Sequence, residues 1–261
     1  MELGLRDRAC IVTGGSRGIG LAAARRLSGE RAKVLLLGRG EAALAAAAAE
    51  CPGAQWLALD VTAPDAGQRA VTACLERFGR VDVVVNNAGT SSVRAIEELD
   101  DLEWQAQWEI NVLAPMRMMR AAVPEMVQRG WGRVVNVSSS SGKRPGQRNV
   151  AYSVTKAAEL SLSRAYADAY AQRGVLINAV TPGPVASELW LAPGGLADQT
   201  AQARGGTREQ VLQAAAAGVP IHRLAQADEI AAVIVFLCSE AASNVAGAAW
   251  SVDGGAVPVI I

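Results

Sequence analysis

Tyr152 and Lys156 stand four residues apart, and Ser139 precedes the tyrosine by thirteen residues. The residues after Tyr152 place apolar side chains at helical spacing, so the tyrosine and the lysine are predicted to share one helix face. A free phenol loses its proton only near about pH 10, but an ammonium group one turn away favours the ionised form. With a serine hydroxyl to bind a substrate oxygen, these side chains could pass a proton to or from a carbonyl or an alcohol.

The same spacing also has an ordinary explanation. Tyrosine and lysine four residues apart occur on many helices, where the ring is half-buried and the lysine is solvated. A motif of this kind is a hypothesis until its structural context agrees. The elements that would position the three residues therefore decide between the two interpretations.

Length and composition narrow the possible classes of protein. The chain has 261 residues, of which 51% are hydrophobic, and its net charge of zero argues against a nucleic-acid binder or an electrostatically anchored membrane protein. Its four cysteines form no closely spaced pair, and its single histidine argues against a zinc centre or a histidine-based triad. The chain shows neither a signal-peptide pattern at its start nor an apolar run of roughly 18–20 residues. We therefore expect a soluble, cytoplasmic protein without a metal.

Short apolar runs alternate with helical patterns along nearly the whole chain. The predicted strands cover 9–13, 33–39, 55–60, 81–89, 133–138, 174–183 and 248–255, and the later predicted helices cover about 41–50, 65–78, 101–129 and 228–239. Strands that are apolar throughout and alternate with helices predict a parallel sheet covered on both faces. The predicted fold class is α/β, a Rossmann-like doubly wound sheet of seven parallel strands in a single domain over 1–261.

One segment interrupts this alternation. Residues 186–220 are rich in Gly, Ala, Gln and Pro and show no strand or clear helix pattern. A loop of this length in a compact domain is more often functional than a mere connection. We therefore expect a substrate lid at about 186–220.

A glycine-rich turn follows the first predicted strand and opens the first helix, with the spacing Gly-x3-Gly-x-Gly over 14–20. Glycines let the backbone approach phosphates, and the free amides and dipole of a helix N-terminus favour an anion. Its place in a strand–turn–helix unit predicts a dinucleotide site, although a tight connection alone would also use glycines. The residues that would hold the dinucleotide here are Gly14, Ser16, Arg17, Gly18 and Ile19.

The end of the second strand bears on cofactor choice. An NAD site usually places an acidic residue there on the ribose, but this chain has Gly38 and Arg39. A guanidinium suits a 2′-phosphate, and Arg17 in the glycine turn could reach the same group. Unless both arginines are merely solvated, NADPH is predicted over NADH. The dinucleotide-binding part would cover about 1–135, and the catalytic and substrate part about 136–255.

Five motifs now stand in order along residues 9–255: GGSRGIG (14–20), NNAG (86–89), Asn111, the set of Ser139, Tyr152 and Lys156, and PGPVAS (182–187). Together they resemble the short-chain dehydrogenase/reductase family, closest in pattern to the 3-oxoacyl-(acyl-carrier-protein) reductases. The resemblance implies an NAD(P)-dependent oxidoreductase that acts on a carbonyl or an alcohol.

The resemblance also implies roles for individual residues. Ser139 would orient the carbonyl, Tyr152 would donate the proton, Lys156 would grip the nicotinamide ribose, and Asn111 would hold a water against the lysine. Further cofactor contacts are implied for Asp60 and Val61 at the adenine, for Asn87, Ala88 and Gly89 along the adenine ribose, and for Pro182, Gly183, Val185 and Ser187 at the nicotinamide. The family usually has threonine at the last position, and the serine keeps its hydroxyl.

The family's assembly gives a further expectation, a homotetramer. Residues 223–255 resemble its C-terminal section, which usually forms one interface, and the helix near 101–129 with the Tyr152 helix would form another. His222 stands where the family commonly has glycine, and we expect no catalytic role for it.

Substrate choice is expected to depend on 90–94, 140–149 and 186–220. Two interpretations stay open for the residues there: Leu189, Trp190 and Leu191 either close over a substrate or pack the loop down, and Lys143, Arg144 and Arg148 either attract an acidic substrate or are solvated. Arg129 and Arg173 follow two helices where related acyl-carrier reductases present basic residues, a hint of a carrier-bound substrate.

These observations predict an NADPH-dependent reductase that converts a ketone, of 3-oxoacyl or related type, to a secondary alcohol. One alternative is an NAD(P)-dependent alcohol dehydrogenase on a sugar, steroid or secondary metabolite. Another is a non-catalytic nucleotide-binding sensor or scaffold, against which the complete Asn, Ser, Tyr and Lys set argues.

Overall fold

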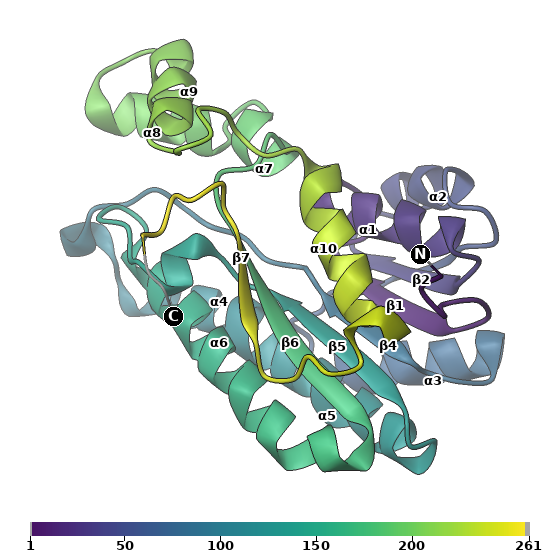
Figure 1. The fold of residues 1–261 in the computed structure, drawn as a ribbon. Helices are drawn as coiled ribbons and strands as arrows, with labels where there is room; N and C mark the ends of the chain where they lie inside the picture. The colour runs from purple at the N-terminus through teal and green to yellow at the C-terminus, as the bar shows by residue number, and fades with distance from the viewer. Residues whose placement is uncertain (1, 259–261) are drawn as a thin grey trace.

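The structure is a computed structural model that describes residues 2–258. In that range the strands are β1 (Ala9–Thr13), β2 (Lys33–Gly38), β3 (Gln55–Ala58), β4 (Val83–Asn86), β5 (Gly132–Val137), β6 (Val175–Pro182) and β7 (Ala249–Val252). They form one sheet in the order β3-β2-β1-β4-β5-β6-β7, and every neighbouring pair is parallel (Figure 1). The predicted Rossmann-like, doubly wound sheet of seven strands is confirmed.

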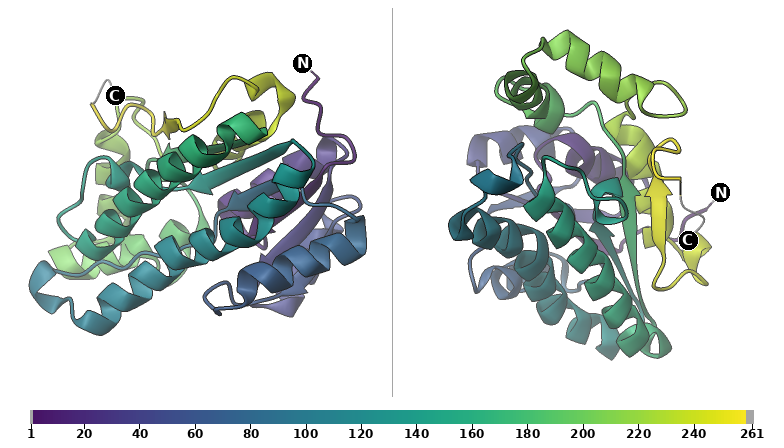
Figure 2. Two further views of the ribbon diagram at one scale, coloured as in Figure 1. Left: turned by 90° about the horizontal axis from the view of Figure 1, so that it is seen from below. Right: turned by 90° about the vertical axis from the view of Figure 1, so that its left-hand side faces the viewer.

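Helices cover both faces of this sheet (Figures 1 and 2). On one face lie α1 (Gly18–Gly29), α2 (Glu41–Ala49) and α10 (Ala227–Cys238), and on the other lie α3 (Ala66–Phe78), α5 (Ala114–Gln128) and α6 (Val150–Tyr170). Successive strand residues point to opposite faces, so Val12 and Leu36 join the first core while Ile11 and Leu35 join the second. This explains why the strand sequences are apolar throughout.

The helix predicted over 101–129 is interrupted in the structure. It consists of α4 (Asp101–Trp108), a π-helical turn η2 (Glu109–Leu113) and α5, which has a proline in its first turn. Pro115 has no N–H to donate to the carbonyl of Asn111 four residues earlier, so a regular α-helical bond is impossible there. The wide turn at Asn111 lies directly before this proline, and such turns frequently occur at functional sites.

The segment 186–220 is helical, which makes the expectation of an irregular loop wrong. It contains α7 (Glu188–Leu191), α8 (Leu196–Arg204) and α9 (Arg208–Ala217), which stand beyond the carboxyl ends of the strands (Figure 1). Thr207 and Gln210 form a reciprocal capping box at the start of α9. A side-chain hydrogen bond joins this segment to the loop after β4: Gln199 Oε1 accepts from the backbone N–H of Val93 (3.0 Å).

Four short 3-10 turns complete the described part of the chain: η1 (Ile96–Glu98), η3 (Ser140–Gly142), η4 (Ala171–Arg173) and η5 (Glu240–Ala242). Between residues 2 and 258 no helix combines the length and the apolar character that a membrane crossing requires.

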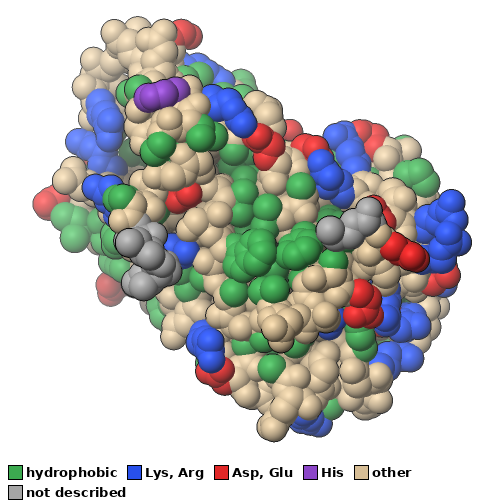
Figure 3. Space-filling view, viewed as in Figure 1, with side chains coloured by type: hydrophobic (Ala, Val, Ile, Leu, Met, Phe, Trp, Pro, Cys, Tyr) green, Lys and Arg blue, Asp and Glu red, His purple; other side chains and the backbone are tan. Residues whose placement is uncertain are grey.

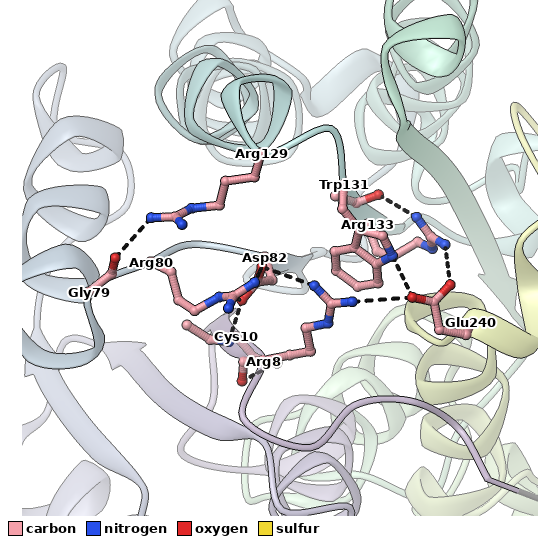
Figure 4. Close-up of polar contacts among 11 residues, drawn as sticks. Arg8, Cys10, Gly79, Arg80, Asp82, Arg129, Trp131, Arg133 and Glu240 are labelled. Carbon is pink, nitrogen blue, oxygen red and sulfur yellow. Dashed lines mark hydrogen bonds and ion pairs between the residues drawn. The ribbon is translucent and has the colours of Figure 1, made fainter.

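The amino ends of the central strands carry a network of charged side chains (Figure 4). Asp82, whose side chain is fully buried, accepts from the backbone N–H of Ala9 (2.8 Å) and from two nitrogens of Arg80 (2.6 Å each). Arg8 lies 3.6 Å from the same carboxylate. Both oxygens of this buried carboxylate therefore accept hydrogen bonds from the protein.

A second acidic residue closes the network at η5. Glu240 accepts from the indole N–H of Trp131 (2.7 Å) and forms ion pairs with Arg8 (3.2 Å) and Arg133 (3.4 Å). The indole of Trp131 contacts both guanidinium groups, at 3.6 Å from Arg8 and 4.4 Å from Arg133. These contacts join β1, β5 and the end of α10 at the edge away from the glycine turn.

Candidate active site

The glycine turn at the end of β1 is braced by the segment that follows β4. The Asn87 side-chain amide donates to the carbonyls of Thr13 (3.0 Å) and Gly14 (3.2 Å), and the backbone N–H groups of Asn87 and Ala88 both donate to Thr13 Oγ1 (2.9 Å each). Asn87 therefore supports the turn from behind with its side chain.

The turn forms a cradle that larger residues would fill. Gly14 has a φ of +63°, and a Cβ on Gly20 would lie 2.3 Å from the Gly14 carbonyl oxygen. Helix α1 begins at Gly18 without a side-chain cap and without an acidic residue in its first turn, so its first amides are available to an anion. The cradle, the uncapped helix and the small side chains fit the pyrophosphate of a dinucleotide.

The two arginines proposed for the 2′-phosphate are both exposed, and neither forms an ion pair within residues 2–258. Arg39 lies near enough to Asp60 to act on it. Hydrogen bonds from the backbone N–H and the hydroxyl of Thr62 hold the pKa of Asp60 below its usual value, and the charge of Arg39 adds to this. The end of β2 thus carries a guanidinium beside the carboxylate that follows β3.

Ser139 lies directly after β5, where it caps η3. Its Oγ accepts from the backbone N–H of Ser141 (3.1 Å), which leaves its own hydroxyl hydrogen available to a ligand. The neighbouring Ser138 instead donates to the carbonyl of Lys156 (2.9 Å). Of these two serines, Ser139 is therefore the one whose hydroxyl can still donate a hydrogen bond to a ligand.

Tyr152 and Lys156 lie on successive turns of α6, as their spacing predicts. Tyr152 is half-buried, and the ammonium of Lys156 lies 5.8 Å from the centre of its ring. Lys156 is almost fully buried, and its Nζ donates to the Val137 carbonyl (2.9 Å) and to Glu159 Oε2 (2.8 Å). An ammonium has three donors, so one is left for a ligand.

Lys156 and Glu159 form a buried ion pair, since both side chains are nearly inaccessible to solvent. Burial alone would lower the pKa of Lys156, but the Glu159 carboxylate, together with Tyr152, raises it above its ordinary value. Burial also raises the pKa of Glu159, which the lysine opposes only in part. The carboxylate of Glu159 and the phenol of Tyr152 thus both favour the charged form of Lys156.

Asn111, in the π-helical turn, is fully buried beside this pair. Its amide nitrogen donates to Gln107 Oε1 (2.9 Å) and to Thr155 Oγ1 (3.2 Å), while its Oδ1 has no protein partner. A Cβ placed on Gly89 would lie 3.1 Å from that oxygen and 3.7 Å from Lys156 Nζ. An orphaned acceptor beside a spare ammonium donor fits a site for a polar ligand or a water.

The residues proposed for the nicotinamide lie at the end of β6, whose last residue is Pro182, and directly after it. Pro182 and Val185 are buried, and Gly183 lies against the backbone of Asp253. Across the gap, the Ser187 Cβ lies 3.7 Å from where a Cβ on Gly18 would be. The structure therefore brings the predicted cofactor residues of β1, β4 and β6 to one edge of the sheet.

Some residues singled out in the sequence lie elsewhere. Lys143 is half-buried, and its Nζ donates to the Ala249 carbonyl (2.7 Å) and to Ser251 Oγ (3.0 Å) on β7. Arg129 donates to the carbonyl of Gly79 (2.9 Å), and Arg173 lies 5.8 Å from the Tyr170 ring, both at the edge opposite Tyr152. Within one chain, these last two residues cannot approach a substrate at Tyr152.

For Leu189 and Leu191 of α7, the structure argues against one of the two interpretations, that they pack the loop down. Their side chains are exposed, at 40% and 37%, so they do not pack the segment onto the body of the molecule. Arg144 and Arg148 are exposed, as a solvated charge would be.

Three neighbours of the site were missed in the sequence: Gln107, Thr155 and Glu159. Gln107 and Thr155 are buried and orient the Asn111 amide, and Glu159 pairs with Lys156. A signal for the last existed, because an acidic residue three positions after a lysine shares its helix face. The sequence alone does not show that this face is buried.

Comparison with known proteins agrees with this geometry. The family described as short chain dehydrogenase matches residues 8–192. The chain is 32% identical to galactitol 2-dehydrogenase of Agrobacterium fabrum, over 96% of this chain and 98% of that protein. It is 29% identical to the 3-oxoacyl-(acyl-carrier-protein) reductase of Aquifex aeolicus, over 98% and 99% respectively.

A solved structure gives the same result. The L-sorbose reductase of Gluconobacter frateurii, in complex with NADPH and L-sorbose, superposes with a TM-score of 0.92 at 33% identity and covers 100% of both chains. The match thus extends through the whole sheet and the helical segment beyond it. The chain belongs to the short-chain dehydrogenase family and is an NAD(P)-dependent oxidoreductase that acts on a carbonyl or an alcohol.

Proposed function

We propose that this protein uses NADPH to reduce a ketone to a secondary alcohol. The observation that carries the proposal is the convergence of Ser139, Tyr152, Lys156 and Asn111 beside an uncapped glycine turn. A hydroxyl donor, a phenol, a buried ammonium and an orphaned acceptor at one edge are what proton transfer to a carbonyl requires.

Each of these residues has a definite task in the proposal. The hydroxyl of Ser139 donates to the carbonyl oxygen and polarises it, and the phenol of Tyr152 donates a proton to the same oxygen. The free donor of Lys156 holds a ribose hydroxyl and keeps positive charge near the phenol, while Asn111 Oδ1 accepts from a water in the path to solvent. NADPH, when bound, supplies the hydride.

The choice of NADPH rests on the two exposed arginines. Arg17 and Arg39 have no anionic partner in an ion pair within the described chain, and both belong to the loops that flank the cradle. A 2′-phosphate between them would accept charge-assisted hydrogen bonds, each worth about 1.5–3 kcal/mol. Asp60 and Val61 would contact the adenine, and Ala88 and Gly89 its ribose.

For the substrate we propose a 3-oxoacyl-type ketone, with a ketose as the second candidate. The polar side chains near Ser139 favour the second, because Asn149 Nδ2 donates to Ser141 Oγ (3.3 Å) and could equally bind a sugar hydroxyl. Galactitol 2-dehydrogenase and L-sorbose reductase, by their names, act on such compounds. The segment 186–220 would act as the substrate lid over either ligand.

The direct test is NADPH oxidation by the wild-type protein with two ketones, acetoacetyl-CoA and L-sorbose. We expect turnover of at least one of them, and the ratio of the two kcat/KM values identifies the substrate class. Tight NADPH binding, measured by its fluorescence, without turnover of any ketone in a wider panel would contradict the proposal and favour a nucleotide sensor.

We further propose a homotetramer. Hydrophobic side chains gather over α10 and β7 (Figure 3), where the rings of Phe236 and Trp250 lie 5.5 Å apart and Trp250 is 37% exposed. Leu102 and Trp108 of α4 are exposed as well and would belong to a second interface. Sedimentation should show four copies, with a smaller species for Trp250→Glu. A wild-type monomer at micromolar concentration would contradict this.

We propose the cytoplasm as the location, because all four cysteines are buried free thiols. Equal labelling of Cys10, Cys51, Cys74 and Cys238 after unfolding, without reductant, supports a reduced protein. A disulfide in the protein isolated under thiol-blocking conditions would contradict it.

A further inference from the structure

Glu188, the first residue of α7, places a carboxylate over the amino end of α1. Its Oε2 lies 3.4 Å from where a Cβ on Gly18 would be, which is closer than the Cβ of Ser187 at 3.7 Å. Gly18 is the first residue of α1 and belongs to the glycine turn. The carboxylate therefore lies beside the helix amides that the pyrophosphate of a dinucleotide would use.

The backbone that carries Glu188 is held in place on both sides. Before it, the N–H of Ala186 donates to the carbonyl of Ala225 (2.8 Å), and the N–H of Ala225 donates to the carbonyl of Pro184 (3.0 Å). After it, the carbonyl of Glu188 accepts from the N–H of Ala192 (2.9 Å). The position of Glu188 beside α1 is therefore fixed by the backbone, and only its side chain is free to turn.

No other contact of the Glu188 side chain accounts for its place. The side chain is exposed, and within residues 2–258 it forms neither an ion pair nor a hydrogen bond. The neighbouring cation, Arg17, forms no ion pair in that range either. What the carboxylate does meet is the partial positive charge at the start of α1, which favours an anion.

We propose that Glu188 competes with the pyrophosphate of the dinucleotide for the amino end of α1 and thereby weakens cofactor binding. The inference rests on the proposed function and deepens it, because it names a residue that sets the affinity for NADPH. The pyrophosphate brings negative charge to the place that the carboxylate holds in the free protein. The side chain therefore has to turn toward solvent when the cofactor binds, and its exposure lets it do so without breaking any packing.

The opposite role for Glu188 is also conceivable and predicts the opposite result. A carboxylate that accepted a hydrogen bond from a ribose hydroxyl or from the carboxamide of the cofactor would strengthen binding. A carboxylate that repels the pyrophosphate weakens binding, by an amount that the nearby solvent keeps modest. Removal of the charge therefore distinguishes the two roles by the sign of its effect.

The test measures NADPH binding to the full chain through the fluorescence of NADPH, in wild type and in Glu188→Gln. Glutamine keeps the length of the side chain and removes its charge. We expect the Kd to fall by about three- to ten-fold at low salt. The difference between the two proteins should shrink in 1 M NaCl, where the screening length is about 3 Å. Because NADH has the same pyrophosphate, its Kd should fall by a similar factor.

Two further variants sharpen the result. Glu188→Asp keeps the charge but draws it back by one methylene from Gly18, so its Kd should lie between those of wild type and Glu188→Gln. Glu209→Gln removes an exposed carboxylate from the first turn of α9, in the same segment 186–220, and should leave the Kd unchanged.

Three results would overturn the proposal: binding that is unchanged or weaker in Glu188→Gln, a gain that is undiminished in 1 M NaCl, or a gain for NADPH without one for NADH. The last would assign the repulsion to the 2′-phosphate. These measurements require no ketone, so they can fail while the reductase proposal stands. A wild-type protein that reduces no ketone would overturn the reductase proposal without altering them, and a failure of every variant to bind either cofactor would overturn both.

Discussion

The two edges of the sheet bury charge in different ways. At the amino edge, Asp82 receives two nitrogens of Arg80 and a backbone N–H, and Arg8 lies close to it (Figure 4). At the carboxyl edge, Lys156 has one donor beyond its two protein partners, and Asn111 Oδ1 has no protein partner. The first edge satisfies its buried groups internally, whereas the second leaves groups that a ligand can satisfy.

Because of this difference, groups that stabilise the fold and groups that can do chemistry lie at opposite edges of the same sheet. Parallel strands bring their carboxyl ends together, where the connections to the helices leave room for a ligand. Their amino ends are closed by short connections, so a charge buried there needs a partner from the protein itself. We therefore expect substitutions at the amino edge to change the free energy of unfolding and those at the carboxyl edge to change turnover.

Substitution of Lys156 should give the largest effect, because this residue is both part of the site and the partner of a buried charge. Lys156→Ala removes the ribose contact and the charge near the phenol, and should lower kcat/KM by about 10²–10⁴-fold and weaken NADPH binding. It also leaves Glu159 buried without its partner, which should cost about 3 kcal/mol of unfolding free energy. Urea unfolding and steady-state kinetics measure the two losses separately.

A double variant separates the loss of turnover from the loss of stability. Lys156→Met with Glu159→Leu removes both charges, so stability should return toward wild type while turnover stays lost. Recovery of turnover in the double variant would contradict the role proposed for the lysine.

Asp82→Asn should show the opposite pattern. It removes the charge that Arg80 and Arg8 share, and since both arginines are partly exposed, the expected loss is about 2–3 kcal/mol of unfolding free energy. The kcat of the folded protein should stay within about two-fold of wild type. Asp168→Asn, which breaks an exposed pair, should leave the urea midpoint unchanged. A large drop in the kcat of Asp82→Asn at unchanged stability would contradict the division of roles between the two edges.

Arg39→Asp should reverse the choice of cofactor. At half the usual strength of charge-assisted bonds, because both arginines are exposed, wild type should prefer NADPH by about one to two orders of magnitude. The variant removes a cation and offers the ribose diol an acceptor, so it should prefer NADH. The measurement is the ratio of kcat/KM with each cofactor at fixed ionic strength.

Arg31→Asp provides the matched control for that change. Arg31 is exposed in the turn before β2, at the amino edge, so the same change in charge should leave the cofactor ratio where it was. A wild-type preference for NADH, or an unmoved ratio in Arg39→Asp, would show that NADPH was the wrong choice.

His222 should give the smallest effect. Its φ of +53° lies in the left-handed region, which costs a residue with a Cβ about 1 kcal/mol. His222→Gly should therefore raise the unfolding free energy by about 0.5–1 kcal/mol without changing kcat. His222→Ala keeps the strain and should not stabilise the fold, so equal stabilisation by both variants would exclude this explanation.

Much of the fold could be predicted because its signals are local. Apolar runs such as 9–13 and 133–138 match buried strands, and the glycine spacing over 14–20 marks the strand–turn–helix unit. The four-residue spacing of Tyr152 and Lys156 placed them on one helix face, as the structure has them.

The remaining features depend on tertiary contacts or on weaker signals. The helices within 186–220 are short and alanine-rich, so their periodicity is faint, although Thr207 and Gln210 were a readable capping box. The π-helical turn at Asn111 precedes Pro115, but a proline alone does not say how a helix adapts, since the α-helix continues through Pro124. The pairing of Glu159 with Lys156 requires knowing that the helix face is buried.

The central claim, that the carboxyl edge is a proton-donating site for ketone reduction, is tested most directly on Tyr152→Phe. The substitution removes one hydroxyl and keeps the ring, Lys156 and the cradle. We predict that kcat with the better ketone falls by about 10²–10⁴-fold. The NADPH affinity should stay within a few-fold of wild type, and the urea midpoint should stay close to that of wild type. A Tyr152→Phe protein that reduces the ketone at close to the wild-type rate would contradict the account.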